Sequence, residues 1–430
     1  MKILVFTPVG KQSAIAKVTR MVIDELVAAG HEVDVVSTQK TRPADRDVRP
    51  EFTGFVDWQE IPEVNMLRAH ADLIWHQVGN NYDFHAGNVR WLPETRGVVS
   101  LHDYYLGGLL WGWAADNHRD QAVDAVNVWY GRSIDWLRDI GLPHKLQAAT
   151  WPKYTYSEWL VSAADAVIVH SDLALSKVLA ATGGPVEVLP LPYEAPVDHS
   201  ATDPDIGEKY GRKTVLTFGG INENKAADVV IRAIAANPAT RDALEYRLVG
   251  SIAEDMRSNL TSLADIMGVR LTIVGQVTDE RLSAELANAD LVCCLRIPSL
   301  ESASATAIES MLWSKPTIVA NTGFYSSLPD DAVFKVSLDH VADEVEVLLD
   351  AFAAGTLESA ERSERARRYA ESTFVAGSYA QRLVALAETS YLHLAESDIV
   401  RRYTEYLGEW GVSDSTTVGP ELDDILALFR

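Results

Sequence analysis

The sequence predicts two open α/β domains in series, each built on a parallel β-sheet. Three observations point to this fold class. Short apolar runs alternate with amphipathic stretches of helical period along most of the chain, which is typical of parallel strands joined by helices. A stretch rich in Pro, Asp and Gly interrupts the alternation at 198–212, and the pattern then restarts. A length of 430 residues is enough for two domains with separate cores.

The first domain begins with a clear strand–turn–helix unit. The run Lys2–Thr7 predicts a buried strand, Pro8-Val9-Gly10 a turn, and the apolar spacing over 13–29 an amphipathic helix that Gly30 ends. Apolar runs of suitable length predict the later strands, which are Glu32–Ser37, Asp72–Trp75, Val98–Leu101, Ala166–Val169 and Val186–Leu189.

The second domain repeats the pattern after the linker. The predicted strands are Thr214–Phe218, Tyr246–Val249, Arg270–Val274, Asp290–Leu295 and Thr317–Ala320. The predicted helices are Ala226–Ala236, Asp255–Met267, Asp279–Ala287 and Thr306–Trp313. We therefore expect domains at 1–195 and 213–372, a linker at 196–212, and a charged helical extension at 373–430 that packs back toward the first domain.

The charge balance excludes several classes of partner. The 38 Lys and Arg residues face 61 Asp and Glu residues, which gives a formal net charge of −23. Nucleic acid and anionic membrane would both be repelled, so we expect neither as a partner. No apolar stretch reaches the roughly 18 residues of a membrane span, and the N-terminal apolar run is too short for a secretory signal. A cytoplasmic location is expected. The oligomeric state is not readable from the sequence.

Neither a disulfide framework nor a metal site is expected. The two cysteines, Cys293 and Cys294, are adjacent inside an apolar run and are interpreted as buried thiols on opposite faces of a strand. The single D-x-D sequence, Asp203 to Asp205, lies in the linker and has the composition of a turn. No cluster of His, Cys and carboxylate residues has the spacing of metal ligands.

Tryptophan is concentrated in the first domain, where nine of the 11 lie between Trp58 and Trp159. Aromatic rings stack on the flat faces of sugars, so this region is a candidate platform for an acceptor molecule. The alternative is that the helices covering the first sheet use tryptophan to fill the core.

Two glycine-containing turns follow strands and are candidate anion sites, although the turn at Gly10 is equally well explained as a plain strand–helix connection. Gly10 ends the first strand just before a helix N-terminus, where backbone N–H groups attract phosphate. Gly219 and Gly220 end the first strand of the second domain, and Lys225 follows near the next helix start. The helix dipole disfavours a cation there, so an anion between Lys225 and the glycines explains the lysine better. The turn at Gly10 fits neither the dinucleotide fingerprint nor the P-loop fingerprint.

The most specific motif is a pair of carboxylates eight positions apart. Glu301 is expected in the loop at the carboxyl end of a strand, where open α/β sheets bind ligands, and Glu309 in the following helix. Only small residues, such as Ser302, Ala303, Ser304 and Ala305, follow Glu301 before the helix, so nothing bulky screens the helix N-terminus from a phosphate. Carboxylates accept hydrogen bonds from paired hydroxyls, as in ribose or a sugar.

Together these residues resemble the retaining, family 4 glycosyltransferases of GT-B fold. Glu301 and Glu309 match their E-x7-E motif, and Phe218–Lys225 resembles their phosphate-binding segment. Gly10 matches their first-domain glycine loop and His102 resembles their active-site histidine. Gln276 and Val277 resemble their base-contacting loop. The resemblance covers most of residues 1–335 and implies two Rossmann-like domains facing a ligand cleft.

The resemblance also implies a role for each residue. Glu309 would hold the ribose hydroxyls of a nucleotide-diphosphate sugar, and Glu301 and His102 would contact its sugar. Lys225 would neutralise the diphosphate leaving group. The backbone of Gly10 and of residues 302–305 would contact the phosphates. The implied reaction is metal-independent transfer of the sugar to a hydroxyl of a glycan or small-molecule acceptor, with retention by a front-face mechanism and no further cofactor.

The chain departs from the family pattern at Gly220, where the family usually has an arginine. Loss of a guanidinium removes a strong diphosphate partner, and Arg296, just before the Pro298-Ser299 turn, is the candidate replacement. A second departure is Ser302-Ala303 in place of glycine-rich sequence. Two rival functions remain: a non-catalytic GT-B protein that binds a nucleotide sugar or glycan, and a GT-B-shaped epimerase or phosphorylase.

Overall fold

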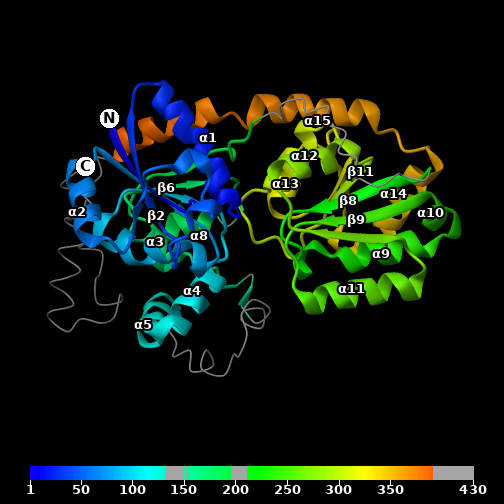
Figure 1. Ribbon diagram of the computed structural model, residues 1–430, viewed down its shortest axis with the longest axis horizontal. Helices are drawn as coiled ribbons and strands as arrows, with labels where there is room; N and C mark the ends of the chain where they lie inside the picture. Colours follow the sequence, from blue (N-terminus) through cyan, green and yellow to red (C-terminus); the bar gives the residue numbers. More distant parts are fainter. Residues whose placement is uncertain (131–149, 152, 174, 195–210, 391–430) are drawn as a thin grey trace, which may run out of the picture. The chain divides into compact units, whose positions relative to one another are not determined.

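A computed structural model describes residues 1–130, 150–151, 153–173, 175–194 and 211–390, which form two compact α/β units (Figure 1). The first unit contains the described parts of residues 1–169, 174–189 and 377–390, and the second contains 170–173 and the described parts of 190–376. Both units are built on a parallel sheet, so the predicted fold class is confirmed. Most of the predicted linker, and residues 391–430 of the predicted extension, lie outside the described residues.

The first unit has a seven-stranded sheet in the order β3-β2-β1-β4-β5-β6-β7. The strands are β1 (Lys2–Thr7), β2 (Glu32–Ser37), β3 (Val56–Asp57), β4 (Leu73–Val78), β5 (Val98–Leu101), β6 (Ala166–Val169) and β7 (Val186–Val188). Every neighbouring pair is parallel. The central strands are buried on both faces, which explains why they read as continuous apolar runs in the sequence.

Helices connect these strands and cover both faces of the sheet (Figure 1). They are α1 (Ala14–Ala28), α2 (Ile61–His70), α3 (Tyr82–Thr95), α4 (Gly107–Trp113), α5 (Arg119–Tyr130), α7 (Glu158–Val161) and α8 (Leu175–Ala181). Short turns of 3-10 or π-helix complete the unit: η1 (Asp45–Asp47), η2 (Pro50–Phe52) and η3 (Ala114–His118). The side chain of Ser13 caps the N-terminus of α1 by accepting a hydrogen bond from the amide of Ala16.

The described chain ends in a helix over residues 376–390 that completes the core of the first unit. Tyr379 and Leu383 pack there against Ile3 and Trp75 from the sheet. The helix approaches α1 closely at Gly377, where a Cβ atom would lie 3.0 Å from a carboxylate oxygen of Glu25. The absence of a side chain at this position therefore permits the contact.

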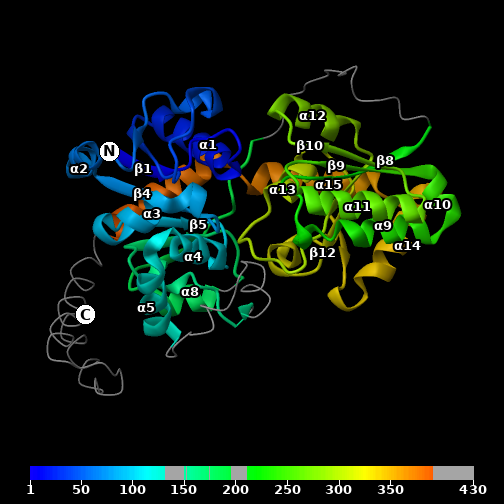
Figure 2. The same ribbon diagram turned by 60° about the horizontal axis from the view of Figure 1, so that its bottom comes forward.

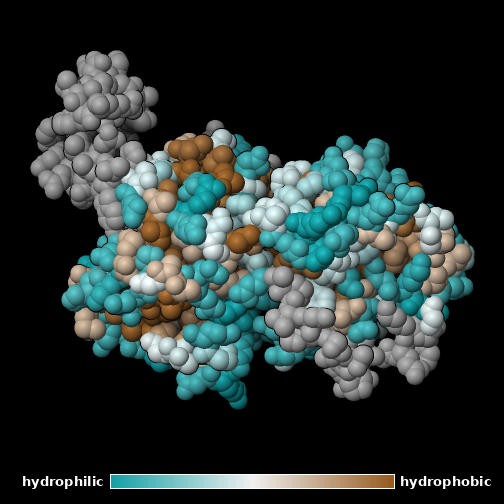
Figure 3. Space-filling model, turned by 90° about the horizontal axis from the view of Figure 1, so that it is seen from above, coloured by the Kyte–Doolittle hydropathy of each residue, from teal (hydrophilic) through white to brown (hydrophobic). Residues whose placement is uncertain are grey.

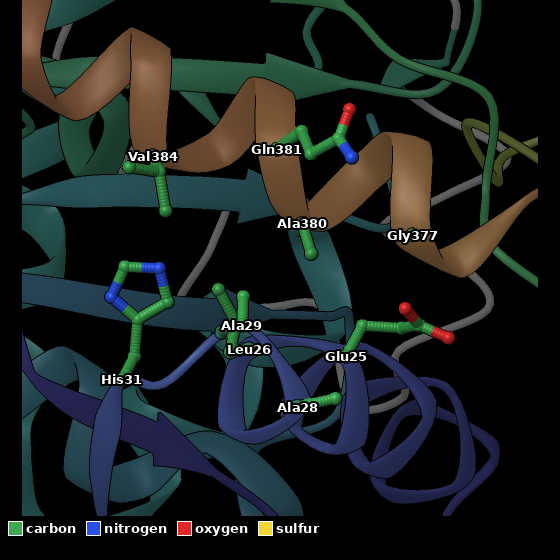
Figure 4. A pocket seen from close by; sticks show the side chains of 9 residues that line it. All are labelled: Glu25, Leu26, Ala28, Ala29, His31, Gly377, Ala380, Gln381 and Val384. Atoms are coloured by element: carbon green, nitrogen blue, oxygen red, sulfur yellow. The ribbon is translucent and has the colours of Figure 1, made fainter.

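A pocket of about 440 Å³ lies between α1 and the helix over 376–390 (Figure 4). Small side chains such as Ala28, Ala29 and Ala380 line it, and Glu25 and His31 add polar groups to the lining. In the surface view, the first unit shows apolar patches among mostly hydrophilic residues (Figure 3).

The second unit has a six-stranded sheet in the order β10-β9-β8-β11-β12-β13 (Figure 2). The strands are β8 (Lys213–Phe218), β9 (Leu244–Val249), β10 (Leu271–Gly275), β11 (Leu291–Cys294), β12 (Thr317–Ala320) and β13 (Phe334–Val336). The helices are α9 (Ala227–Ala236), α10 (Pro238–Ala243), α11 (Glu254–Met267), α12 (Asp279–Asn288), α13 (Ala305–Leu312), α14 (Val341–Ala354) and α15 (Ala360–Thr373). Short 3-10 turns are η5 (Glu223–Lys225), η6 (Gly323–Ser327) and η7 (Leu338–His340).

Two of the tryptophans lie in the core of the first unit. Trp75 and Trp91 are each 1% exposed, so the core-filling interpretation is confirmed for these two. Trp113 and Trp159 are half-buried and stack on each other with ring centroids 5.2 Å apart.

Cys293 and Cys294 are free and buried, as predicted. Within the described ranges, no helix is both long and apolar enough to cross a membrane.

Candidate nucleotide-sugar site

In the second unit, the predicted phosphate-binding glycines follow β8 directly. Gly219 has a φ of +84°, a conformation that side chains disfavour. Its carbonyl oxygen lies so close to Gly250 that a Cβ atom there would be 2.0 Å away. The two loops after β8 and β9 therefore touch through glycine backbone. Gly220 is exposed, and its backbone can be approached by a ligand.

Lys225 is placed at the end of η5 and its side chain turns back toward the glycines. It is 3% exposed, and its Nζ donates a hydrogen bond to the carbonyl oxygen of Phe218. Burial, and then repulsion from Arg296, hold the pKa of Lys225 well below its usual value. A bound anion would reverse this effect by favouring the charged form.

Glu301 lies in the loop that follows β11. Its Oε1 accepts hydrogen bonds from Nε of Arg296 at 2.8 Å and from the phenol of Tyr325 at 2.9 Å. Tyr325 is completely buried in η6, just after β12. Loops from two neighbouring strands thus fix one carboxylate at the carboxyl edge of the sheet, where open α/β sheets bind ligands.

Glu309 lies within α13, beyond its first turn, as the sequence predicts. Its Oε2 accepts a hydrogen bond at 2.9 Å from the phenol of Tyr193, which belongs to the same unit. The carboxylate is half-buried.

The small residues between the two glutamates build the N-terminus of α13. Ser304 caps it, since its side chain accepts a hydrogen bond from the amide of Ala307. Ser302, Ala303 and Ser304 are buried, and Ala305 is half-buried. The carbonyl of Ser302 accepts a hydrogen bond from the hydroxyl of Ser171. The predicted contact between this backbone and a phosphate stays a prediction.

Gln276 and Val277 form the turn between β10 and α12. Gln276 is exposed and Val277 half-buried, so both are accessible at the carboxyl end of β10. Their predicted contact with a nucleobase is not tested by the geometry of the unit.

Gly10 belongs to the first unit and its predicted phosphate-binding amide is already engaged. The amides of Val9 and Gly10 both donate to Oε1 of Gln39, at 3.0 and 2.8 Å. The glutamine oxygen takes the place that a phosphate oxygen would need, so binding through this amide requires Gln39 to move.

His102 follows β5 at the carboxyl edge of the first sheet. The residue is 8% exposed, and its Nε2 lies 2.6 Å from Oε1 of Gln77, a residue of β4. Because an amide oxygen only accepts hydrogen bonds, Nε2 carries the proton in this pair. Gln77 is itself 1% exposed, so the ring is held by a buried partner.

The second unit thus brings most of the predicted donor residues to one sheet edge, after β8, β10 and β11. Sequence reasoning missed four partners of the site residues: Gln39, Gln77, Tyr193 and Tyr325. Tyr325 follows a predicted strand, β12, so its place at the carboxyl edge could have singled it out. The other three carried no signal in the sequence.

Comparisons with known proteins bear on the fold and on the family that the second unit resembles. Residues 199–372 match the family model described as glycosyl transferases group 1. No curated protein matches the chain at a significant level. In a comparison of folds, HepE from Anabaena, solved with UDP and glucose, aligns with a TM-score of 0.62 and 15% identity, covering 90% of this chain and 98% of that one.

Two further structures share the fold. Sucrose-phosphate synthase from Thermosynechococcus elongatus aligns with a TM-score of 0.61 and 16% identity, covering 91% of this chain and 99% of that one. WaaG, a glycosyltransferase involved in lipopolysaccharide biosynthesis, aligns with a TM-score of 0.58 and 13% identity, covering 89% and 99%. At identities this low, the structural similarity establishes the fold alone. The two α/β units of this chain therefore share a fold of the GT-B type with these structures, and residues 199–372 match the family model of group 1 glycosyl transferases.

Proposed function

We propose that this protein transfers a sugar from a nucleoside-diphosphate donor to a hydroxyl group of a glycan or small-molecule acceptor. One observation carries the proposal: Lys225, Arg296, Glu301 and Glu309 all lie after or beside the carboxyl ends of β8 and β11, inside the part of the chain that matches the glycosyltransferase family. Cations and carboxylates of this kind suit the diphosphate and the hydroxyls of a nucleotide sugar.

The chemistry follows from the charges. Departure of the diphosphate leaves negative charge, which Lys225 would stabilise from a largely dehydrated position. Glu309 would accept hydrogen bonds from the ribose hydroxyls, and Tyr193 would hold that carboxylate in place. Glu301 and His102 would contact the donor sugar.

We further propose that the reaction is metal-independent and retains the configuration at the anomeric carbon. In the front-face mechanism the acceptor attacks from the side that the diphosphate leaves, and a donor phosphate oxygen assists its deprotonation. No protein nucleophile is required. The resemblance of the E-x7-E pair to retaining enzymes supports this part of the proposal.

A uridine nucleotide is the first donor to test. HepE, which shares the fold, was solved with UDP and with UDP-glucose. Identity with that protein is 16% and 17% in the two comparisons, so the support concerns the type of site rather than the individual sugar.

The experiment is a thermal-denaturation series with UDP, GDP, ADP and TDP, each with and without EDTA. A ligand at about 100 times its dissociation constant adds about 2.7 kcal/mol of stability, which is a readily measured shift. We expect one nucleotide to stabilise the protein in both conditions, and Glu309→Ala to abolish the shift. Glu358→Ala, at an exposed position, is the matched control.

Turnover then separates the two candidate functions. Release of free nucleotide from the matching nucleotide sugar, with an acceptor product whose anomeric configuration is read by NMR, would establish a retaining transferase. Inverted product would contradict retention. Tight nucleotide binding without turnover across donors and acceptors would instead favour a non-catalytic binding protein, a role consistent with Gly220 in place of the family's arginine.

A further inference from the structure

The carboxylate of Glu301 is held through one of its two oxygens. Both donors, Nε of Arg296 and the phenol of Tyr325, bind Oε1, at 2.8 and 2.9 Å. Among the described residues, Oε2 has no hydrogen-bond partner. The side chain is 17% exposed. Glu301 is thus fixed in orientation and still has one oxygen left for a hydroxyl group.

Arg296 also has unused hydrogen-bonding capacity. A guanidinium carries five N–H donors, and Arg296 uses only the Nε donor in the described part of the chain. Its side chain is 16% exposed, so most of the group has lost contact with water. A guanidinium that is largely dehydrated and incompletely paired is costly, and a ligand with acceptor oxygens would satisfy the two terminal nitrogens.

The charges around Arg296 also favour the binding of an anion. Arg296 lies close enough to Lys225 to disfavour its charged form, and Glu301 is the carboxylate that acts on both cations. When all three groups are ionised, the cluster carries one excess positive charge. Gly220 contributes no side chain here, so the guanidinium reaches this region from the loop after β11 instead.

We propose that Arg296 has two jobs: its terminal nitrogens bind the diphosphate of the donor, and its Nε positions Glu301 toward the donor sugar. This proposal rests on the proposed function. Arg296 would thus bind the diphosphate of the donor and also orient the carboxylate that contacts the donor sugar. Tyr325 is a second positioning residue, which acts on Glu301 without contacting the donor.

The two roles predict different effects on binding and on turnover. UDP is the probe for binding, and the turnover number is measured with UDP-glucose or with the sugar nucleotide found active. Arg296→Ala should weaken UDP binding at least tenfold and lower kcat. Tyr325→Phe should leave UDP affinity within about twofold of the wild type and still lower kcat several-fold.

Arg296→Lys separates the charge from the fork geometry. An ammonium can face the diphosphate, but it cannot at the same time reproduce the Nε bond to Glu301. We expect UDP affinity within a few-fold of the wild type, with kcat lowered as in Tyr325→Phe. The double variant Arg296→Lys with Tyr325→Phe should lose less than the product of the single losses, since both substitutions act on one carboxylate. Arg232→Ala, on the exposed side of α9, is the control and should match the wild type.

Each alternative outcome is decisive. If Arg296→Ala binds UDP as the wild type does, Arg296 does not bind the diphosphate. If Arg296→Lys or Tyr325→Phe keeps full kcat, the proposal that these residues position Glu301 is wrong. Failure of the proposed function looks different, because the wild type itself would then show no stabilisation by UDP, GDP, ADP or TDP. Cooperative thermal unfolding of each variant verifies that a loss does not reflect misfolding.

Discussion

The hydroxyl of Ser100 and the phenol of Tyr379 lie 2.7 Å apart, although 279 positions separate them in the sequence. Ser100 is in β5, and its hydroxyl also accepts a hydrogen bond from the indole of Trp75 at 2.8 Å. Both Ser100 and Tyr379 are buried. The hydrogen bond ties the helix over 376–390 to the middle of the first sheet, two residues before His102.

We expect Tyr379→Phe to lower the free energy of unfolding by about 1 kcal/mol, because it removes one buried hydrogen bond and keeps the ring. Tyr379→Ala should cost about 3–5 kcal/mol, since it also leaves a cavity in the core. Urea denaturation measures both values. Glu388→Gln, on the exposed side of the same helix, is the control. Equal stability of Tyr379→Phe and the wild type would show that the contact contributes nothing.

Two buried histidines predict that the protein loses stability in mild acid. Burial lowers the pKa of His76 to about 4 and that of His85 to about 3. In the unfolded chain both titrate near 6.5, so below that pH the unfolded chain binds more protons and becomes favoured. Each histidine should cost up to about 1.4 kcal/mol per pH unit, from pH 6.5 down toward its folded pKa.

Urea denaturation at a series of pH values tests this prediction. Between pH 6.5 and 5 the two histidines together should remove about 4 kcal/mol at most. His85→Gln should make the dependence on pH less steep, even if it lowers stability at neutral pH. His70→Asn, at an exposed position, should leave the steepness unchanged. A flat profile over this interval would contradict the assignment.

Substitution of Lys225 should affect the stability of the ligand-free protein and the binding of nucleotide differently. A buried ammonium costs free energy, so Lys225→Met should leave the ligand-free protein as stable as the wild type or more stable. The same substitution should abolish stabilisation by the nucleoside diphosphate. Thermal denaturation with and without the nucleotide measures both effects. Retention of the nucleotide shift in Lys225→Met would remove this residue from the donor site.

The two cysteines should be inert in the native protein. Burial raises the pKa of Cys293 and of Cys294, so little thiolate forms at neutral pH. We expect no reaction with a thiol reagent such as DTNB until the protein is unfolded in denaturant, when two thiols should react. Rapid labelling under native conditions would show that this part of the second sheet opens.

Sequence reasoning found the parallel strands because their apolar runs reflect burial on both faces. It missed β3, which has two residues, and β13, which has three and is only partly buried. Both lie at sheet edges, where a strand needs neither length nor a continuous apolar run. The helix over 376–390 was expected, but its contacts with Trp75 depend on packing that no local pattern contains.

The candidate site was predictable in its charged residues and not in their partners. Glu301 and Glu309 were identified by their spacing, and Lys225 by its place between a glycine turn and a helix start. The hydrogen bond from Tyr193 to Glu309 spans 116 positions, and only the folded chain brings the pair together. Arg296 was singled out for its charge, whereas its bond to Glu301 required the geometry of the loop after β11.

Among the described residues, the first unit takes one of its core helices from a point in the chain that follows the whole of the second unit. During synthesis, its sheet is therefore complete long before residues 377–390 leave the ribosome. At about 5–20 residues per second the delay is on the order of ten to forty seconds. Throughout that interval the sheet face that carries Ile3 and Trp75 has only the partial cover of α1, through Val22 and Leu26, and the apolar surface that later meets Tyr379 and Leu383 stays exposed.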